Sequence, residues 1–291
     1  MLDLVEPKLQ YVPYKDGQIA YRETAGTGSA LFLLHGMNGS SKSWSNLYSS
    51  LGKLFRVIAW DAPSFGASDV FGDNIQEYKN AAKALISKLN IEDFVVLGHS
   101  MGGLVAAQIA ADKDLSIAGL VLSSSHLGFG RPKGEELMPR YEKRIEIFNN
   151  KNTDISFRID RAKFNSPKGT NEKVIQFLAN VSADVRMESI RDGGRMSQET
   201  DNKIISSEIK VPILILSGGQ DTIISTEMHS ELVTAFPRAQ QVVFPKAGHA
   251  SYAEYPELFN EQVREFSEKA CDLNLPSSKQ NKENINERKN K

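Results

Sequence analysis

Six apolar runs, separated by stretches with helical character, constrain the fold of this chain most strongly. None of the runs alternates with polar residues, so each is expected to be a strand that is buried on both faces. A parallel sheet between two layers of helices meets that requirement. The predicted strands span residues 30–34, 56–60, 94–97, 118–122, 212–216 and 241–244.

A hairpin and five helices complete the predicted pattern. Residues 8–14 and 18–24 are expected to be two strands joined at Asp16-Gly17, a pair that favours a tight turn. The predicted helices span residues 43–52, 75–90, 103–111, 226–235 and 256–270. The sequence therefore predicts an α/β fold with a mostly parallel eight-stranded sheet flanked by helices.

The strand pattern is interrupted by a long insertion. Residues 127–206 give helical signals without an apolar strand, which predicts a helical cap over the carboxyl edge of the sheet. The core would then comprise residues 1–126 and 207–275. The insertion holds fifteen Lys and Arg against twelve Asp and Glu, so it forms either a solvated surface or an entrance that attracts anions. Residues 276–291 are nearly all polar and are expected to be a disordered tail.

Composition excludes several classes of protein. The chain has 35 basic and 36 acidic residues, so no strong field would attract nucleic acid or an anionic membrane. Cys271 is the single cysteine, which rules out an intramolecular disulfide or a thiolate metal cluster. The first ten residues contain no continuous apolar run, so we expect neither a signal peptide nor a membrane span. These features indicate a soluble, cytoplasmic protein of undetermined oligomeric state.

A candidate nucleophile lies in the segment Gly98-His99-Ser100-Met101-Gly102. An apolar run precedes this segment and a stretch of small residues follows it, so it reads as a strand, a sharp turn and a helix. In such an elbow, only small residues fit two positions before and two positions after the serine. Gly98 and Gly102 satisfy that demand, which makes Ser100 the best candidate.

A serine nucleophile requires a base, and the base requires a group that orients it. Asp221 follows the apolar run at residues 212–216, and His249 follows the run at residues 241–244. Carboxyl ends of parallel strands meet at one edge of a sheet, so both side chains are expected near Ser100.

The elbow, the two loops and the order Ser100, Asp221, His249 resemble the α/β-hydrolase superfamily over about residues 18–266. The resemblance implies that Ser100 is the nucleophile, Asp221 the acid and His249 the base. It also implies that the backbone N–H groups of Met37 and Met101 form an oxyanion hole. The motif Leu33-Leu34-His35-Gly36 precedes the first of these donors, and His35 is expected to shape the loop.

Substrate contacts are expected from the cap, because it would roof the pocket. The candidates are His126, Phe129, Phe164, Phe177, Met187 and Met196. No metal or cofactor is expected, since no cysteine cluster, H-E-x-x-H motif or dinucleotide fingerprint is present. The expected partner is a small ester or lactone, either neutral or anionic.

Other functions remain as alternatives or are disfavoured. The segment from Gly36 to Ser43 lies where a phosphate loop would lie, but it lacks the glycine needed at Ser41. A ligand receptor on the same fold could retain a complete triad. Hydrolases that cut carbon–carbon bonds share the scaffold, although they usually have Asn at the position of His99 and Trp shortly after the histidine.

Within the family, serine at position 100 argues against the dehalogenase and epoxide-hydrolase branches, which require a carboxylate nucleophile. The stretch Arg56-Val57-Ile58-Ala59-Trp60-Asp61-Ala62-Pro63 looks more like relatives of the esterase and enol-lactonase branch. The sequence therefore predicts hydrolysis of a carboxylic ester or lactone through an acyl-enzyme.

Overall fold

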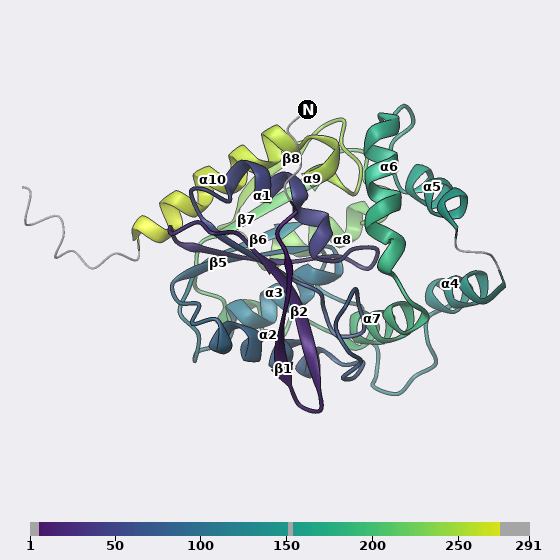
Figure 1. Cartoon of the computed structure of the whole chain (residues 1–291), viewed down its shortest axis with the longest axis horizontal. Coiled ribbons are helices and arrows are strands. Elements are labelled where there is room, and N and C mark those ends of the chain that lie inside the picture. Colours follow the sequence, from purple (N-terminus) through teal and green to yellow (C-terminus); the bar gives the residue numbers. More distant parts are fainter. Residues whose placement is uncertain (1–5, 151–153, 274–291) are drawn as a thin grey trace, which may run out of the picture.

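A computed structural model describes residues 6–150 and 154–273, with the backbone alone at Asn150 and Leu273. The predicted tail at residues 276–291 lies outside the described residues. The described residues form one eight-stranded sheet with the order β1-β2-β4-β3-β5-β6-β7-β8 (Figure 1). The strands β1 and β2 pair antiparallel with each other, and β2 pairs antiparallel with β4. The remaining neighbours are parallel, so the predicted, mostly parallel sheet is confirmed.

The strands lie close to where the apolar runs predict them. Residues of the central strands β3, β5 and β6 are buried on both faces, as expected for a sheet covered by helices. The bounds are β1 Leu9–Tyr14, β2 Gly17–Glu23, β3 Ala30–Leu34, β4 Arg56–Trp60, β5 Phe94–His99, β6 Ile117–Ser123, β7 Ile213–Gly218 and β8 Gln240–Phe244.

Helices cover both faces of the sheet, and each face has its own hydrophobic core (Figure 1). On one face lie α2 (Ile75–Lys88), α3 (Met101–Ala110) and α8 (Thr226–Ala235). On the other lie α1 (Ser45–Leu51), α9 (Ser251–Glu254) and α10 (Pro256–Leu273). Because both faces are covered, the carboxyl edge of the sheet is where loops can build a site.

Helices also fill the long connection between β6 and β7, where the described residues contain no strand. They extend beyond the sheet and appear in teal and green in Figure 1. Their bounds are α4 Pro139–Asn150, α5 Ile155–Phe164, α6 Glu172–Val181, η2 Ser182–Asp184, α7 Met187–Glu199 and η3 Ser206–Glu208. We refer to the segment from α4 to α7 as the cap helices. Among the described helices, none is long and apolar enough to cross a membrane.

The helix α7 docks closely on the loop that follows β4. The Ser64 hydroxyl donates to Asp192 Oδ2 at 2.6 Å, and the Ser189 hydroxyl donates to the Ser64 carbonyl at 2.6 Å. A Cβ on Gly193 would lie 2.9 Å from both Met101 Sδ and Phe65 Cζ, so the glycine permits the close approach. These contacts hold one cap helix directly against the elbow.

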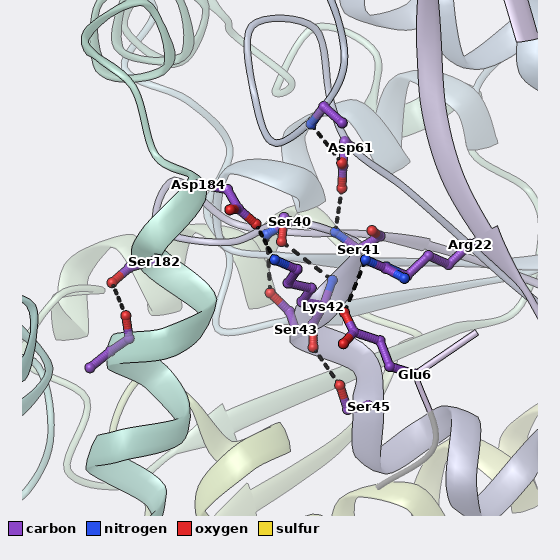
Figure 2. A network of polar contacts seen from close by, with 12 residues as sticks. Glu6, Arg22, Ser40, Ser41, Lys42, Ser43, Ser45, Asp61, Ser182 and Asp184 are labelled. Carbon is purple, nitrogen blue, oxygen red and sulfur yellow. Dashed lines mark hydrogen bonds and ion pairs between the residues drawn. The ribbon is translucent and has the colours of Figure 1, made fainter. Parts of the chain in front are cut away.

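A second group of polar contacts fixes the loop after β3 (Figure 2). Asp61 Oδ1 accepts a hydrogen bond from the Ser41 amide at 2.7 Å, within the short helix η1 (Ser41–Trp44). Lys42 Nζ lies 2.8 Å from Asp184 Oδ2 in η2, as Figure 2 shows. The same loop is therefore tied to the loop after β4 on one side and to the cap helices on the other.

Candidate active site

Ser100 lies in a strained elbow between β5 and α3. Its φ of 52° and ψ of −119° are rarely adopted by residues other than glycine. A Cβ on Gly98 would lie 2.3 Å from the Gly102 carbonyl oxygen, and a Cβ on Gly102 would lie 2.3 Å from the Leu34 carbonyl oxygen. The two glycines are therefore required by close backbone packing, as the motif predicts.

Hydrogen bonds from β6 and the loop after it hold the elbow in place. The Ser100 amide donates to the Ser123 carbonyl at 2.9 Å, and the Ser125 hydroxyl donates to the Ser100 carbonyl at 2.8 Å. The strain at Ser100 is thus offset by contacts on both sides of the residue. Sequence reasoning did not identify Ser125, because a serine after a buried strand carries no distinctive pattern.

Asp221 and His249 meet at the carboxyl edge of the sheet. His249 Nδ1 lies 2.9 Å from Asp221 Oδ2, with Asp221 on the loop after β7 and His249 on the loop after β8. Asp221 Oδ1 accepts hydrogen bonds from the amides of Ile223 at 2.8 Å and Ile224 at 3.1 Å. Both carboxylate oxygens are therefore occupied, which fixes the orientation of the carboxylate toward the imidazole.

The surroundings of Asp221 favour its ionised form. Burial acts to raise the pKa of Asp221, but the hydrogen bond and charge of His249 and the two backbone amides outweigh it. The net result is a pKa below the usual value of 3.8. An anionic carboxylate beside Nδ1 favours the imidazole tautomer that carries its hydrogen there and leaves Nε2 free to accept a proton.

His99 packs against this pair without replacing His249. The ring centroids of His99 and His249 are 4.8 Å apart, and His99 is buried with its Nδ1 3.4 Å from Ser123 Oγ. Burial, followed by the charge of His249, lowers the pKa of His99 well below its usual value. A neutral ring at this position packs beside His249 and adds no competing charge.

Ser100 and His249 line the same cavity, which has a volume of about 570 Å³. Among the described residues, no hydrogen bond joins the Ser100 hydroxyl to His249. Catalytic hydrogen bonds in enzymes without substrate are often long or misaligned, so the shared cavity is the relevant observation.

The loop after β3 brings Met37 to the same cavity, and Met101 lines it from the start of α3. Amides in the first turn of a helix have no partner within the helix, so that of Met101 can serve an external acceptor. His35 shapes the loop, because its Nε2 accepts a hydrogen bond from the Ala62 amide at 3.0 Å and its Nδ1 donates to the Gly36 carbonyl at 2.9 Å. Burial lowers the pKa of His35, consistent with this neutral tautomer.

Three of the six side chains that the sequence suggested for the pocket line the cavity. His126 and Phe129 lie there with ring centroids 5.1 Å apart, and Phe164 lies there while remaining 80% exposed. Burial, followed by the charge of Arg140, lowers the pKa of His126 to about 4. His126 is therefore neutral at physiological pH and contributes a polar but uncharged wall.

The other three candidates lie elsewhere. Met196 is fully buried in the core formed with α2 and α3, and Phe177 packs against the core on the opposite face of the sheet. Met187 is partly buried at the beginning of α7 and is not among the lining residues. An apolar side chain on a cap helix can face either the pocket or the sheet, and the sequence did not distinguish the two directions.

Five cationic side chains line the cavity, and the lining contains no Asp or Glu. They are Arg140, Lys143, Arg144, Arg158 and Arg161, all on α4 and α5. Their only signal in the sequence is the excess of Lys and Arg in the insertion. Apolar residues form much of the remaining wall, including Phe148, Phe157 and Leu178. In the ranges that the structure describes, no three His, Cys, Asp or Glu side chains are grouped as metal ligands would be.

Comparisons with known proteins identify the family of this chain. The family model described as alpha/beta hydrolase fold matches residues 29–256. A pimeloyl-[acyl-carrier protein] methyl ester esterase from Pectobacterium atrosepticum is 27% identical over 85% of this chain and 98% of its own length. A 2-hydroxy-6-oxo-6-phenylhexa-2,4-dienoate hydrolase from Comamonas testosteroni is 26% identical over 89% of this chain and 94% of its own length.

Solved structures show the same fold. The enol-lactonase from Burkholderia xenovorans LB400 superposes with a TM-score of 0.76 at 22% identity, covering 88% of this chain and 99% of its own. A thermophilic esterase from Thermogutta terrifontis gives a TM-score of 0.77 at 23% identity, covering 90% and 99%. With the family model spanning most of the chain, this protein belongs to the α/β-hydrolase family and is a hydrolytic enzyme.

Proposed function

We propose that this protein is a serine hydrolase that cleaves a carboxylic ester or lactone of a small molecule through an acyl-enzyme. The observation that carries the proposal is the oriented pair of His249 and Asp221 at the cavity that Ser100 enters from a strained elbow. A base held by a carboxylate beside a raised serine is the arrangement that acyl transfer requires.

In the first half of the reaction, His249 Nε2 removes the proton from the Ser100 hydroxyl as Oγ attacks the substrate carbonyl. Asp221 stabilises the imidazolium that forms, and the amides of Met37 and Met101 hold the negative oxygen. His249 then gives the proton to the leaving alcohol, and the carbon–oxygen bond breaks to leave an acyl group on Ser100.

In the second half, His249 removes a proton from water, which attacks the acyl carbonyl. The bond to Ser100 Oγ breaks, Ser100 regains its proton from His249, and the carboxylic acid leaves. In a lactone the alcohol and the acid are parts of one molecule, so the product is a single hydroxy acid.

The names of the relatives favour an ester, since the bacterial esterase above aligns over nearly its whole length. Hydrolysis of a carbon–carbon bond is a second candidate, because several relatives carry dienoate hydrolase names at 23% to 26% identity. His99 and the segment Ser251-Tyr252 differ from the pattern typical of that group, which favours the ester.

Replacement of the nucleophile tests the proposal. Ser100→Ala is expected to lower kcat for an aryl ester by about 10⁴-fold or more, with little change in the unfolding temperature. Ser124→Ala is the matched control, because its hydroxyl is buried beside the elbow without a hydrogen-bond partner among the described residues. Retained turnover in Ser100→Ala would contradict the proposal, and a panel of aryl esters, lactones and vinylogous diketones separates the two candidate reactions.

A further inference from the structure

The five cations that line the cavity share two helix faces. Arg140 and Arg144 are four residues apart on α4, and Arg158 and Arg161 are three residues apart on α5. Side chains at these spacings lie on the same face of a helix. Both faces turn toward the cavity, so like charges are gathered where mutual repulsion would disfavour them.

Several other cations of the insertion at residues 127–206 do have acidic partners. Arg131 lies 2.8 Å from Glu135, Lys163 lies 3.3 Å from Glu172, and Arg195 lies 3.6 Å from Glu199. Among the described residues, none of the five cavity cations has an acidic partner within ion-pair distance. The cap helices thus have carboxylates available, yet those carboxylates are absent from the cavity wall.

The contacts that the cavity cations do make leave their charge uncompensated. Arg144 Nη2 donates to Asn38 Oδ1 at 2.6 Å, and the guanidinium of Arg140 lies 5.6 Å from the ring centroids of Phe129 and Tyr141. Arg158 Nε is buried and has no hydrogen-bond partner in the described ranges. The side chain of Arg161 likewise has no ion pair or hydrogen bond there. A buried donor without a partner is costly, so these groups point to an acceptor that binds in the cavity.

Burial disfavours the charged form of two of these guanidinium groups. Burial, followed by the charge of Arg161, lowers the pKa of Arg144 to about 9, and burial lowers the pKa of Arg161. With a pKa of about 9, Arg144 is still protonated at neutral pH. An anion in the cavity would offset the cost of holding these charges together.

Guanidinium groups bind carboxylates and phosphates through paired, charge-assisted hydrogen bonds. The rest of the wall contains aromatic and aliphatic side chains such as Phe148, Phe157 and Leu178. The complementary occupant is an apolar stem that carries an anionic group at one end.

We propose that Arg144, Arg158 and Arg161 bind the anionic end, a carboxylate or a phosphate, of an ester whose apolar stem extends to Ser100. This inference rests on the proposed ester hydrolysis and names its substrate class. Arg144 also links the two sites, because Asn38, its hydrogen-bond partner, follows Met37 in the loop after β3.

Matched substrates test the assignment. The p-nitrophenyl ester of hexanoic acid is neutral, whereas the mono-p-nitrophenyl ester of adipic acid carries a terminal carboxylate on a stem of similar length. A third ester carries a terminal phosphate. We expect the wild-type chain to have a higher kcat/KM for at least one anionic ester than for the neutral one, and the larger of the two preferences identifies the anion.

The double variant Arg158→Gln/Arg161→Gln is expected to lower that preference, measured as the ratio of the two kcat/KM values, by about tenfold or more. Lys163→Gln is the matched control on the same helix, since Lys163 is paired with Glu172 and lies outside the cavity wall. Its ratio should change less than about twofold. Equal loss for both substrates, an equal effect of Lys163→Gln, or no preference in the wild type would overturn the proposal.

A binding measurement that needs no turnover distinguishes a failure of this inference from a failure of the proposed ester hydrolysis. Monomethyl adipate is titrated calorimetrically into Ser100→Ala, and then into Ser100→Ala combined with the double variant. A Kd about tenfold weaker in the second chain supports the arginine site even if the wild type hydrolyses no ester. Equal Kd values, or no binding to either chain, would contradict it.

Discussion

The sheet and the cap helices differ in which side chains they bury and where they place charged ones. In the sheet, β3, β5 and β6 are buried along their whole length, and the helices beside them contribute apolar side chains to two cores. In the cap helices, α4 and α5 leave most side chains partly or fully exposed and direct unpaired cations into the cavity. The difference is the one expected if the sheet supplies stability and position and the cap helices bind the proposed substrate.

The first prediction compares the same substitution in the two regions. Phe32 is fully buried in β3, whereas Phe164 is 80% exposed at the end of α5. Phe32→Ala is expected to lower the free energy of unfolding by about 3 to 5 kcal/mol, because it removes buried apolar contacts and leaves a cavity. Phe164→Ala is expected to change it by less than about 0.5 kcal/mol.

Urea denaturation of the two variants and the wild type measures both values. Similar losses of unfolding free energy in the two variants would mean that the cap helices share the cooperative stability of the sheet. That result would contradict the difference between the two regions. A small loss of unfolding free energy for Phe164→Ala, together with a changed KM, would support the difference between the two regions, since Phe164 also lines the cavity.

Replacing charged side chains is expected to change the free energy of unfolding less. The charge of Asp221, beside the sheet, has partners, whereas the charge of Arg161, in the cap helices, has none among the described residues. Asp221 is satisfied by His249 and two amides, so Asp221→Asn is expected to lower the free energy of unfolding at pH 7 by about 1 to 3 kcal/mol. Burial lowers the pKa of Arg161, which means that folding disfavours its charge. Arg161→Gln is therefore expected to leave stability unchanged or to raise it slightly.

The stabilisation by the Asp221 carboxylate should depend on pH. Since folding lowers the pKa of Asp221, the carboxylate contributes fully to the free energy of unfolding above pH 3.8. That contribution is lost as the pH falls through the lowered pKa. The difference in stability between wild type and Asp221→Asn should shrink over that window. Acid denaturation curves that stay parallel down to pH 2 would contradict this account.

Much of the sheet was predictable because an apolar strand buried on both faces has a distinctive pattern. Residues 30–34 and 56–60 agree with β3 and β4 to the residue, and the elbow motif located Ser100 between β5 and α3. The helix predicted at residues 43–52 is present as α1, but it starts at Ser45 because the preceding residues form η1, which Ser40 caps and Asp61 holds at Ser41. The four-residue helix α9 was not predicted, because so short a helix has no periodicity to detect.

Side-chain directions in the cap helices were less predictable. Met196 and Phe129 are both apolar residues of the same insertion, but the first is buried in a core and the second lines the cavity. Asp192 gave no signal either, although it anchors α7 through Ser64, because the partner lies 128 positions away in sequence. Such contacts depend on tertiary packing, which local periodicity does not encode.

The proposed role of Ser100 as a nucleophile activated by His249 can be tested by covalent labelling. The wild-type chain is treated with an alkyl fluorophosphonate, which phosphonylates activated serines with loss of fluoride, and the modified peptide is located by mass spectrometry. We expect one adduct per chain, on Ser100, and strongly slowed labelling in His249→Ala. An adduct on another residue, or labelling of Ser100 at an unchanged rate in His249→Ala, would contradict it.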